Sequence, residues 1–250
     1  MSRRLRAPID ALTSGERELH GESLHYLTRV LRLRSGDTFT AFDPLSGLTA
    51  EVVVDEFEHG RFKIRIGEVS ASGASEAAAQ SITWIHGLPK GDKADSIVRD
   101  ATELGATTIQ FAVTRHGVPK MDAAKAESRL ARWTKIAVEA SRQAERPRPP
   151  EVLPLVPWAE AIGKAKAASA KAFLLHSRGG EALGAPLLAA LADEAHALVF
   201  AAGPEGGFAD DEVLAAQQAG FRVTTLGPLI LRTETVPAAV LGALRVMASA

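Results

Sequence analysis

The chain has 250 residues, of which 46% are hydrophobic and 24% charged, with a net charge of −1 and no cysteine. This composition is typical of a soluble globular protein that is long enough for one large domain or two modest ones. The lack of cysteine excludes disulfides, thiolate zinc sites, iron–sulfur clusters and cysteine nucleophiles.

The charges are unevenly distributed along the chain. Residues 1–35 hold seven Arg against four acidic residues, and residues 86–150 hold twelve Lys or Arg against eight. Two basic segments suit an anionic partner, although solvated helix faces would give the same pattern. The N-terminus lacks the apolar core of a signal peptide, and no stretch is long enough to span a bilayer. We therefore expect a cytoplasmic protein without a membrane partner.

The first 70 residues predict a small β-barrel or sheet domain. In Arg61–Ile66 the apolar residues Phe62, Ile64 and Ile66 alternate with cations, which is typical of a half-buried strand. Two further strands are expected at Thr38–Phe42 and Thr49–Val54. The small and polar residues of 71–80 show no apolar periodicity and predict a linker.

Residues 81–250 predict an α/β domain, because apolar β-type runs alternate with helical patterns. Such alternation is typical of a mainly parallel sheet covered by helices, and ligands bind such sheets at the carboxyl ends of the strands. The expected strands are Ile82–Leu88, Thr107–Val113, Ala172–His176, Ala197–Ala202 and Phe221–Leu226, and the expected helices include Ala94–Leu104, Leu130–Ala144, Asp210–Ala219 and Val236–Met247.

The segment Gly203–Phe208 follows one of these strands and reads Gly-Pro-Glu-Gly-Gly-Phe. Its glycines allow a close approach of the backbone to a ligand, and the next helix offers free N–H groups. The pattern is neither a phosphate-binding P-loop nor a dinucleotide fingerprint, and a plain strand-to-helix turn remains the alternative. Ala209 stands where a hydroxyl residue would cap the helix, so Asp210 is the expected cap.

A second unusual segment, Leu226–Thr235, lies between the last expected strand and the final helix. Arg232 and Glu234 lie there in otherwise apolar surroundings, where unpaired charges are costly. They either pair with each other or face a substrate. The seven His show no metal-ligand spacing, so no metal is expected, and no Gly-x-Ser-x-Gly nucleophile elbow occurs.

Several motifs, taken in order, resemble the bacterial 16S rRNA uridine N3-methyltransferase family, ribosomal RNA small subunit methyltransferase E, of the knotted SPOUT superfamily. The similarity covers nearly the whole chain, and the order and spacing of the motifs carry it. They are Arg3-Arg4, His25–Leu33 with Gly36-Asp37, Gly87–Lys93, Ala101–Gly105, Arg132-Trp133, Glu139-Ala140 with Gln143, Gly203–Phe208 and Leu226–Thr235. Departures from the family pattern include Leu229 after Gly-Pro, Val236 after Glu-Thr, and His116 in place of an Arg.

This resemblance implies a PUA-like RNA-binding β-barrel over residues 1–70 and a SPOUT methyltransferase domain with a C-terminal trefoil knot over 81–250. It also implies S-adenosylmethionine as cofactor, 16S rRNA of the small ribosomal subunit as partner, and a homodimer. Carried over by position, the cofactor-binding residues are Leu175, Gly203, Glu205, Gly206, Gly207, Leu226, Gly227, Ile230, Leu231 and Arg232.

The expected reaction is methylation of uridine N3, which requires removal of its proton and a base that is unpaired. Arg232 could stabilise the uridine anion or hold a phosphate, and Glu205 or Glu234 could accept the proton. The expected RNA contacts, mainly to phosphates, are Arg3, Arg4, Arg29, Arg32, Lys90, Arg142 and Arg146. The rival hypotheses are a SPOUT enzyme acting on another rRNA or tRNA position and an inactive RNA-binding assembly factor. A nucleotide-hydrolysing enzyme ranks last, since a phosphate-binding lysine loop is missing.

Overall fold

The computed structural model describes residues 5–43, 46–58, 61–71, 80–117, 121–146, 148–167, 170–193 and 196–248. The chain divides into two compact units. The first unit comprises Met1–Ala78 with Ser141–Pro149, and the second comprises Ala79–Ala140 with Pro150–Ala250. The linker expected at residues 71–80 falls mainly on residues 72–79, which lie outside the described residues.

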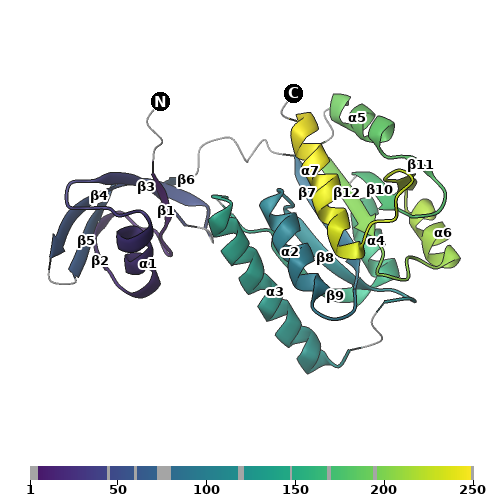
Figure 1. Cartoon of the computed structure of the whole chain (residues 1–250), viewed down its shortest axis with the longest axis horizontal. Helices are drawn as coiled ribbons and strands as arrows, with labels where there is room; N and C mark the ends of the chain where they lie inside the picture. Colours follow the sequence, from purple (N-terminus) through teal and green to yellow (C-terminus); the bar gives the residue numbers. More distant parts are fainter. Residues whose placement is uncertain are drawn as a thin grey trace. The chain divides into compact units, whose positions relative to one another are not determined.

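The first unit is built around a mainly antiparallel sheet with the strand order β1-β3-β4-β5-β2, and β6 pairs with β4 (Figure 1). Only the β1–β3 pair among these strands is parallel. The elements are β1 (Arg6–Pro8), β2 (Gly15–Leu19), α1 (Gly21–His25), the π-helix η1 (Tyr26–Val30), β3 (Thr38–Phe42), β4 (Leu48–Glu58), β5 (Arg61–Ile66) and β6 (Ser70–Ala71).

The expected alternation along β5 is present. Phe62, Ile64 and Ile66 are buried in the core of the first unit, whereas Lys63 and Arg65 are exposed. Strand β4 is longer than expected and contains a β-bulge between Val54 and Glu56. A bulge lets a long strand bend over a small core.

The second unit contains a seven-stranded sheet with the order β11-β13-β10-β12-β7-β8-β9, in which every pair is parallel. The predicted mainly parallel α/β sheet is therefore confirmed. Its strands are β7 (Ser81–Gly87), β8 (Thr108–Val113), β9 (Glu151–Pro157), β10 (Lys171–Leu175), β11 (Glu181–Ala182), β12 (Ala197–Ala202) and β13 (Phe221–Thr225).

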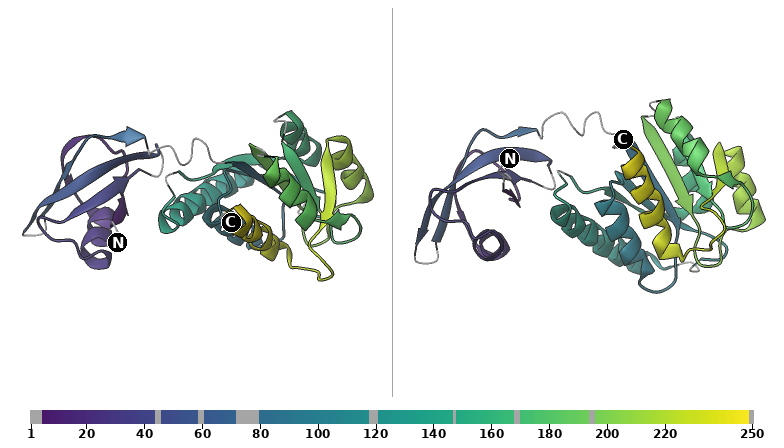
Figure 2. Two further views of the ribbon diagram at one scale, coloured as in Figure 1. Left: turned by 90° about the horizontal axis from the view of Figure 1, so that it is seen from above. Right: turned by 45° about the horizontal axis from the view of Figure 1, so that its top comes forward.

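Helices cover both faces of this sheet (Figure 2). The helices are α2 (Lys93–Glu103), α3 (Ala123–Gln143), α4 (Trp158–Ala167), α5 (Gly184–Ala192), α6 (Asp210–Gln218) and α7 (Val236–Ala248), and the short 3₁₀ helix η2 (Thr233–Thr235) precedes α7. Buried residues of α2, α3, α5 and α7 share one core cluster, and those of α4 and α6 share another.

Successive side chains of each strand enter these two cores in turn, as the two-residue period of a strand requires. Trp84 of β7 packs in the α2–α7 core, and its neighbour Ile85 packs in the α4–α6 core. The same division separates Phe173 from Leu174 in β10. Because the inner strands β7, β8, β10 and β12 are buried on both faces, they are largely apolar, which explains why the sequence predicts them.

Candidate functional site

Two loops leave the carboxyl edge of the parallel sheet and face a common cavity. Residues 203–209 connect β12 to α6, and residues 226–232 connect β13 to η2. Strand β10 lies between β12 and β13 and is paired with both, so its end contributes to the same place. Ligands of α/β sheets bind at this edge.

The cavity has a volume of about 310 Å³, at the lower end of the range for small-molecule sites. Its walls combine apolar side chains with loop backbone and four charged groups. The lining residues are Lys93, Leu175, His176, Ser177, Ala202, Gly203, Pro204, Glu205, Gly207, Phe208, Thr225, Leu226, Leu229, Ile230, Leu231, Arg232, Thr233, Glu234 and Val236.

Two glycines in the 203–209 loop are needed for its path. Gly207 has a φ of +68°, a conformation that residues with a side chain rarely adopt. A Cβ atom on Gly206 would lie 2.7 Å from Cβ of His116, which also has Nδ1 3.1 Å from the Gly206 carbonyl oxygen. His116 therefore packs directly against this loop, and the loop accommodates it by having no side chain at residue 206.

The start of α6 corrects one expectation from the sequence. The cap of α6 is Ala209, not Asp210, because Ala209 has the extended backbone of a capping residue. The Glu212 carboxylate accepts a hydrogen bond from Ala209 N at 2.9 Å and another from Arg115 N at 2.8 Å. A side chain from the first turn thus replaces the missing hydroxyl and ties the loop to residues that follow β8.

Glu205 is held at the cavity wall by two donors. Lys93 Nζ lies 2.6 Å from its Oε1, and Lys90 N lies 3.2 and 3.3 Å from its two carboxylate oxygens. Partial burial raises the pKa of Glu205, but hydrogen bonds from Lys93 and from backbone N–H groups outweigh this effect and hold the pKa below its ordinary value. Glu205 is therefore an ionised and weakly basic carboxylate.

Arg232 and Glu234 do not pair with each other among the described residues, and both line the cavity. Glu234 Oε2 is buried and makes no hydrogen bond, and Lys93 Nζ lies 4.0 Å away. The Arg232 side chain is exposed. Of the two possibilities that the sequence left open, pairing with each other is not found, and a role toward a substrate stays a prediction.

The structure brings together most of the residues expected to bind the cofactor. Eight of the ten line the cavity; Gly206 and Gly227 do not. Lys93 and Thr233 were not assigned a role from the sequence, although both lie inside motifs that carry the family resemblance. Leu229 and Ile230 are 76% and 80% exposed at the cavity rim.

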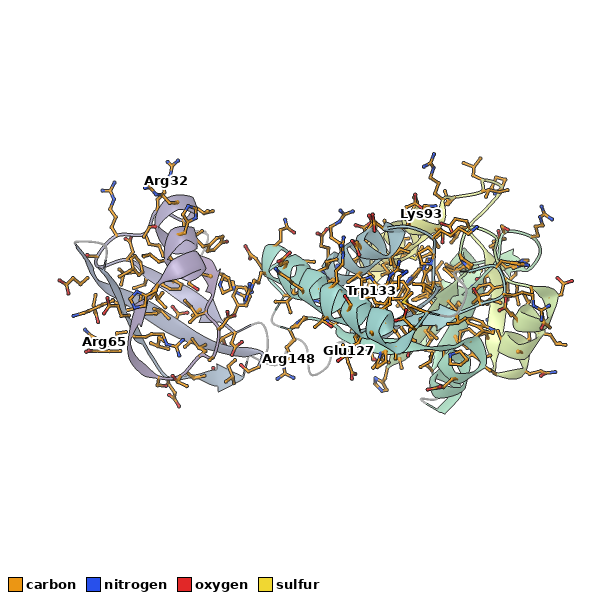
Figure 3. All side chains as sticks on the ribbon, turned by 90° about the horizontal axis from the view of Figure 1, so that it is seen from below. Arg32, Arg65, Lys93, Glu127, Trp133 and Arg148 are labelled. Atoms are coloured by element: carbon orange, nitrogen blue, oxygen red, sulfur yellow. The ribbon has the colours of Figure 1, made fainter. Side chains whose placement is uncertain are left out.

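The residues expected to contact RNA fall into four groups. Arg29, Arg32 and Lys90 are exposed, and Arg32 projects beside the α1–η1 segment (Figure 3). Arg142 is paired with Asp10, with 2.9 Å between the charged groups. Arg146 is only 8% exposed, so its assignment to an RNA-binding surface is wrong. Arg3 and Arg4 lie outside the described residues.

Two further observations concern metal binding and membrane insertion. Within the described residues, no three His, Asp or Glu side chains are grouped so that they could hold a metal ion. No helix in the described part of the chain combines the length and apolar character needed to cross a membrane.

The geometry predicts that the side chain of Lys93, but not that of Lys90, controls the ionisation of Glu205. Lys93→Met should raise the pKa of Glu205 toward the ordinary value, whereas Lys90→Met should leave it unchanged because Lys90 donates only its backbone N–H. Carboxyl ¹³C NMR titration measures both. Equal effects of the two substitutions would contradict the assignment.

The same contacts define a pH dependence of stability. Because folding lowers the pKa of Glu205, the ion pair stabilises the protein above the unfolded value of about 4.3. This contribution is lost as the pH falls through the lower pKa of the folded state. Thermal melting of the wild type should therefore converge with that of Lys93→Met in acid.

Known proteins are similar to this chain in both sequence and fold. The model of the RNA methyltransferase domain family matches residues 76–245. Ribosomal RNA small subunit methyltransferase E of Synechocystis sp. is 32% identical over 217 residues, 86% of this chain and 67% of that protein. The Mycobacterium bovis protein of the same name is 31% identical, over 91% of this chain and 85% of its own length.

A crystal structure of the Neisseria gonorrhoeae protein of this name, bound to S-adenosylmethionine, is similar with a TM-score of 0.76 and 29% identity, covering 98% of each chain. The sequence match and the structural match thus extend over both units. The chain belongs to the ribosomal RNA small subunit methyltransferase E family.

Proposed function

We propose that this protein transfers the methyl group of S-adenosylmethionine to N3 of a uridine in the 16S rRNA of the small ribosomal subunit. The observation that carries the proposal is the cavity at the carboxyl edge of the sheet, enclosed by the two loops that bear the family motifs. A relative that covers 98% of this chain was crystallised with S-adenosylmethionine. The family relatives are named for methylation of small-subunit rRNA.

The cavity residues fit this cofactor. Leu175, Phe208 and Leu226 offer apolar surface to an adenine ring, and the loop backbone offers hydrogen-bonding groups. S-adenosylmethionine supplies a methyl group on a positively charged sulfur. Two carboxylates, Glu205 and Glu234, and two cations, Lys93 and Arg232, line the cavity. The positively charged sulfur is favoured beside the carboxylates and disfavoured beside the cations.

We assign the role of proton acceptor to Glu234 rather than Glu205. Glu205 is occupied by Lys93 and by the backbone of Lys90, and its lowered pKa makes it a poor base. Glu234 lines the same cavity, and its side chain is 23% exposed, although its Oε2 atom is buried and lies 4.0 Å from Lys93 Nζ. The exposed part of this carboxylate can accept the N3 proton of a uridine held against it.

Arg232 supplies a positive charge that complements the uridine anion. Among the described residues it has no ion-pair partner, whereas Lys93 is paired with Glu205. The Arg232 guanidinium can therefore stabilise the uridine anion that forms when N3 loses its proton, or hold a neighbouring phosphate in place. Methyl transfer then depends mainly on holding N3 in line with the methyl group.

We also propose a fold for each part of the chain. We assign a PUA-like barrel to residues 1–70, a linker to 71–80 and a SPOUT domain with a trefoil knot to 81–250. The placement of α7 supports a knot, because α7 follows the outlying strand β13 yet packs in the core shared with α2. The antiparallel strands of the first unit support the barrel assignment. We place the enzyme in the cytoplasm, where its rRNA substrate is found.

A homodimer is the assembly that the family resemblance implies. The exposed Leu229 and Ile230 support it, because large apolar side chains grouped at a loop mark interaction surfaces. Sedimentation equilibrium measures the mass in solution, and a strictly monomeric but active enzyme would refute the dimer.

Methyl transfer to small ribosomal subunits tests the function directly. Subunits from a strain that lacks this modification are incubated with the protein and labelled S-adenosylmethionine, and the nucleosides of the rRNA are identified by mass spectrometry. We expect N3-methyluridine with the wild type and none with Arg232→Ala. A methyl group on another base or on a ribose would indicate a different target, and cofactor binding without transfer would indicate an assembly factor.

The assignment of the base predicts different behaviour for the two carboxylates. Glu234→Gln should lower kcat by about 10²–10⁴-fold and remove the acidic limb of the pH–rate profile. Glu205→Gln should act mainly on the affinity for S-adenosylmethionine and retain that limb. Single-turnover rates across pH distinguish the two. An unchanged pH profile in Glu234→Gln would rule it out as the base.

The exposed arginines of the α1–η1 segment are expected to contact RNA phosphates. Replacing Arg29 and Arg32 together by Ala should weaken RNA binding and reduce the slope of log affinity against log salt by about 0.7 for each phosphate that is no longer neutralised. Arg65→Ala is the matched control, because Arg65 is an exposed arginine of β5 that is paired with Asp55 (Figure 3). An equal change of slope in the control would refute the location of the RNA surface.

A further inference from the structure

A chain of hydrogen bonds, two of them buried and the third partly buried, links β7 to both loops of the cavity. His86, near the end of β7, is fully buried, and Thr233, at the start of η2, is 7% exposed. His86 Nδ1 lies 3.1 Å from Nε1 of Trp84, and His86 Nε2 lies 2.8 Å from Oγ1 of Thr233. The Thr233 hydroxyl lies 2.6 Å from the carbonyl oxygen of Gly203.

The direction of every bond in this chain follows from its first member. The Trp84 indole N–H can only donate, so His86 Nδ1 must accept and carries no proton. The neutral ring then holds its proton on Nε2 and donates it to Thr233 Oγ1. The Thr233 hydroxyl, having accepted one bond, donates its own proton to the Gly203 carbonyl oxygen.

His86 stays neutral in this position. Burial lowers its pKa to about 3, against a smaller opposing effect of the negative charge on Glu205. A protonated ring would also carry a proton on Nδ1, so that two N–H donors, His86 Nδ1 and Trp84 Nε1, would point at each other. The chain of bonds therefore keeps one arrangement throughout the neutral pH range, so His86 is unsuited to carry protons.

The residues at the loop end of this hydrogen-bond chain indicate its role. Gly203 is the first residue of the 203–209 loop, and Thr233 directly follows the 226–232 loop. One hydroxyl group thus holds the base of one loop against the end of the other, and both residues line the cavity. Because two of these bonds are buried and the third is partly buried, breaking one leaves polar groups poorly solvated and without partners, which makes the arrangement stiff.

We propose that the Trp84–His86–Thr233–Gly203 chain sets the spacing of the two loops before the ligand binds, with His86 and Thr233 as positioning residues. The inference rests on the proposed function in one respect only, namely that S-adenosylmethionine is the ligand between the loops. The alternative is that His86 merely satisfies a buried indole and contributes to stability alone.

The first test removes the shared hydroxyl. Thr233→Val keeps the size of the side chain but loses the bonds to His86 and Gly203, whereas Thr233→Ser keeps the hydroxyl. Thr107→Val is the matched control, because the Thr107 hydroxyl, like that of Thr233, both accepts and donates a hydrogen bond. It accepts from Ile82 N and donates to the Ile82 carbonyl oxygen, both at 3.0 Å, near the opposite end of β7.

Amide hydrogen exchange of the ligand-free proteins reports the loops without reference to any cofactor. We expect Thr233→Val to exchange about tenfold faster in residues 203–209 and 226–232. Thr233→Ser should resemble the wild type, and Thr107→Val should leave both loops unchanged. If Thr233→Val exchanges like the wild type in these loops, the proposal is overturned.

Calorimetric titration with S-adenosylmethionine then measures the consequence. Thr233→Val should bind about tenfold more weakly, with Thr233→Ser restored and Thr107→Val unchanged despite a lower melting temperature. If both valine variants lose stability and neither loses affinity, the role of the chain is structural and the proposal fails. If the wild type itself does not bind, the proposed function fails, and the exchange experiment still decides the role of the chain.

Discussion

The arrangement of the site depends on one constraint, the parallel pairing of all seven strands in the second unit. Because the pairs are parallel, β7, β10, β12 and β13 all end at the same edge of the sheet. The chain builds the sheet outward from β7 through β8 to β9, and then crosses to the other side of β7, where β10 is laid down first and β12 later fills the place between β10 and β7. At such a reversal, neighbouring loops diverge and leave a crevice. The cavity lies beside this reversal.

The charges at the cavity follow from this placement. Lys93 begins α2, just after β7, and reaches Glu205, which follows β12. Lys93 is thus paired with Glu205 and lies 4.0 Å from Glu234, while we propose that Arg232 and Glu234 act on the substrate. The division separates residues that shape the cavity from residues that can act on a base. Sequence reasoning grouped Glu205 with Glu234, because their different partners arise only in the folded chain.

Most of the second unit was predictable because its strands are buried on both faces and therefore form continuous apolar runs. The ends of β12 were predicted correctly, and those of β7, β8, β10 and β13 to within a residue. Strand β9 was missed. It contains Pro154 and ends at Pro157, and it tolerates these prolines because it lies at the edge of the sheet. Helix α3 begins seven residues earlier than the expected start at Leu130, because its first turns carry few apolar residues.

The site was predictable only as far as the family motifs reached. The two loops were identified, but the contacts that hold them were not, because they join residues far apart in sequence. Lys93 and Glu205 are 112 residues apart, and His86 and Thr233 are 147 apart. Burial of Arg146 and capping of α6 by Ala209 and Glu212 likewise depend on tertiary packing. A local sequence pattern does not show which distant residues will be in contact.

We propose that the two loops enclose the cofactor at the carboxyl edge of the sheet. This placement can be tested with a crystal structure of the full chain grown with S-adenosylhomocysteine, the product left after methyl transfer. We expect density for the ligand between residues 203–209 and 226–232, with Arg232 and Glu234 facing the sulfur side. Density for the ligand at another site, with this cavity empty, would show that the cofactor does not bind between the two loops.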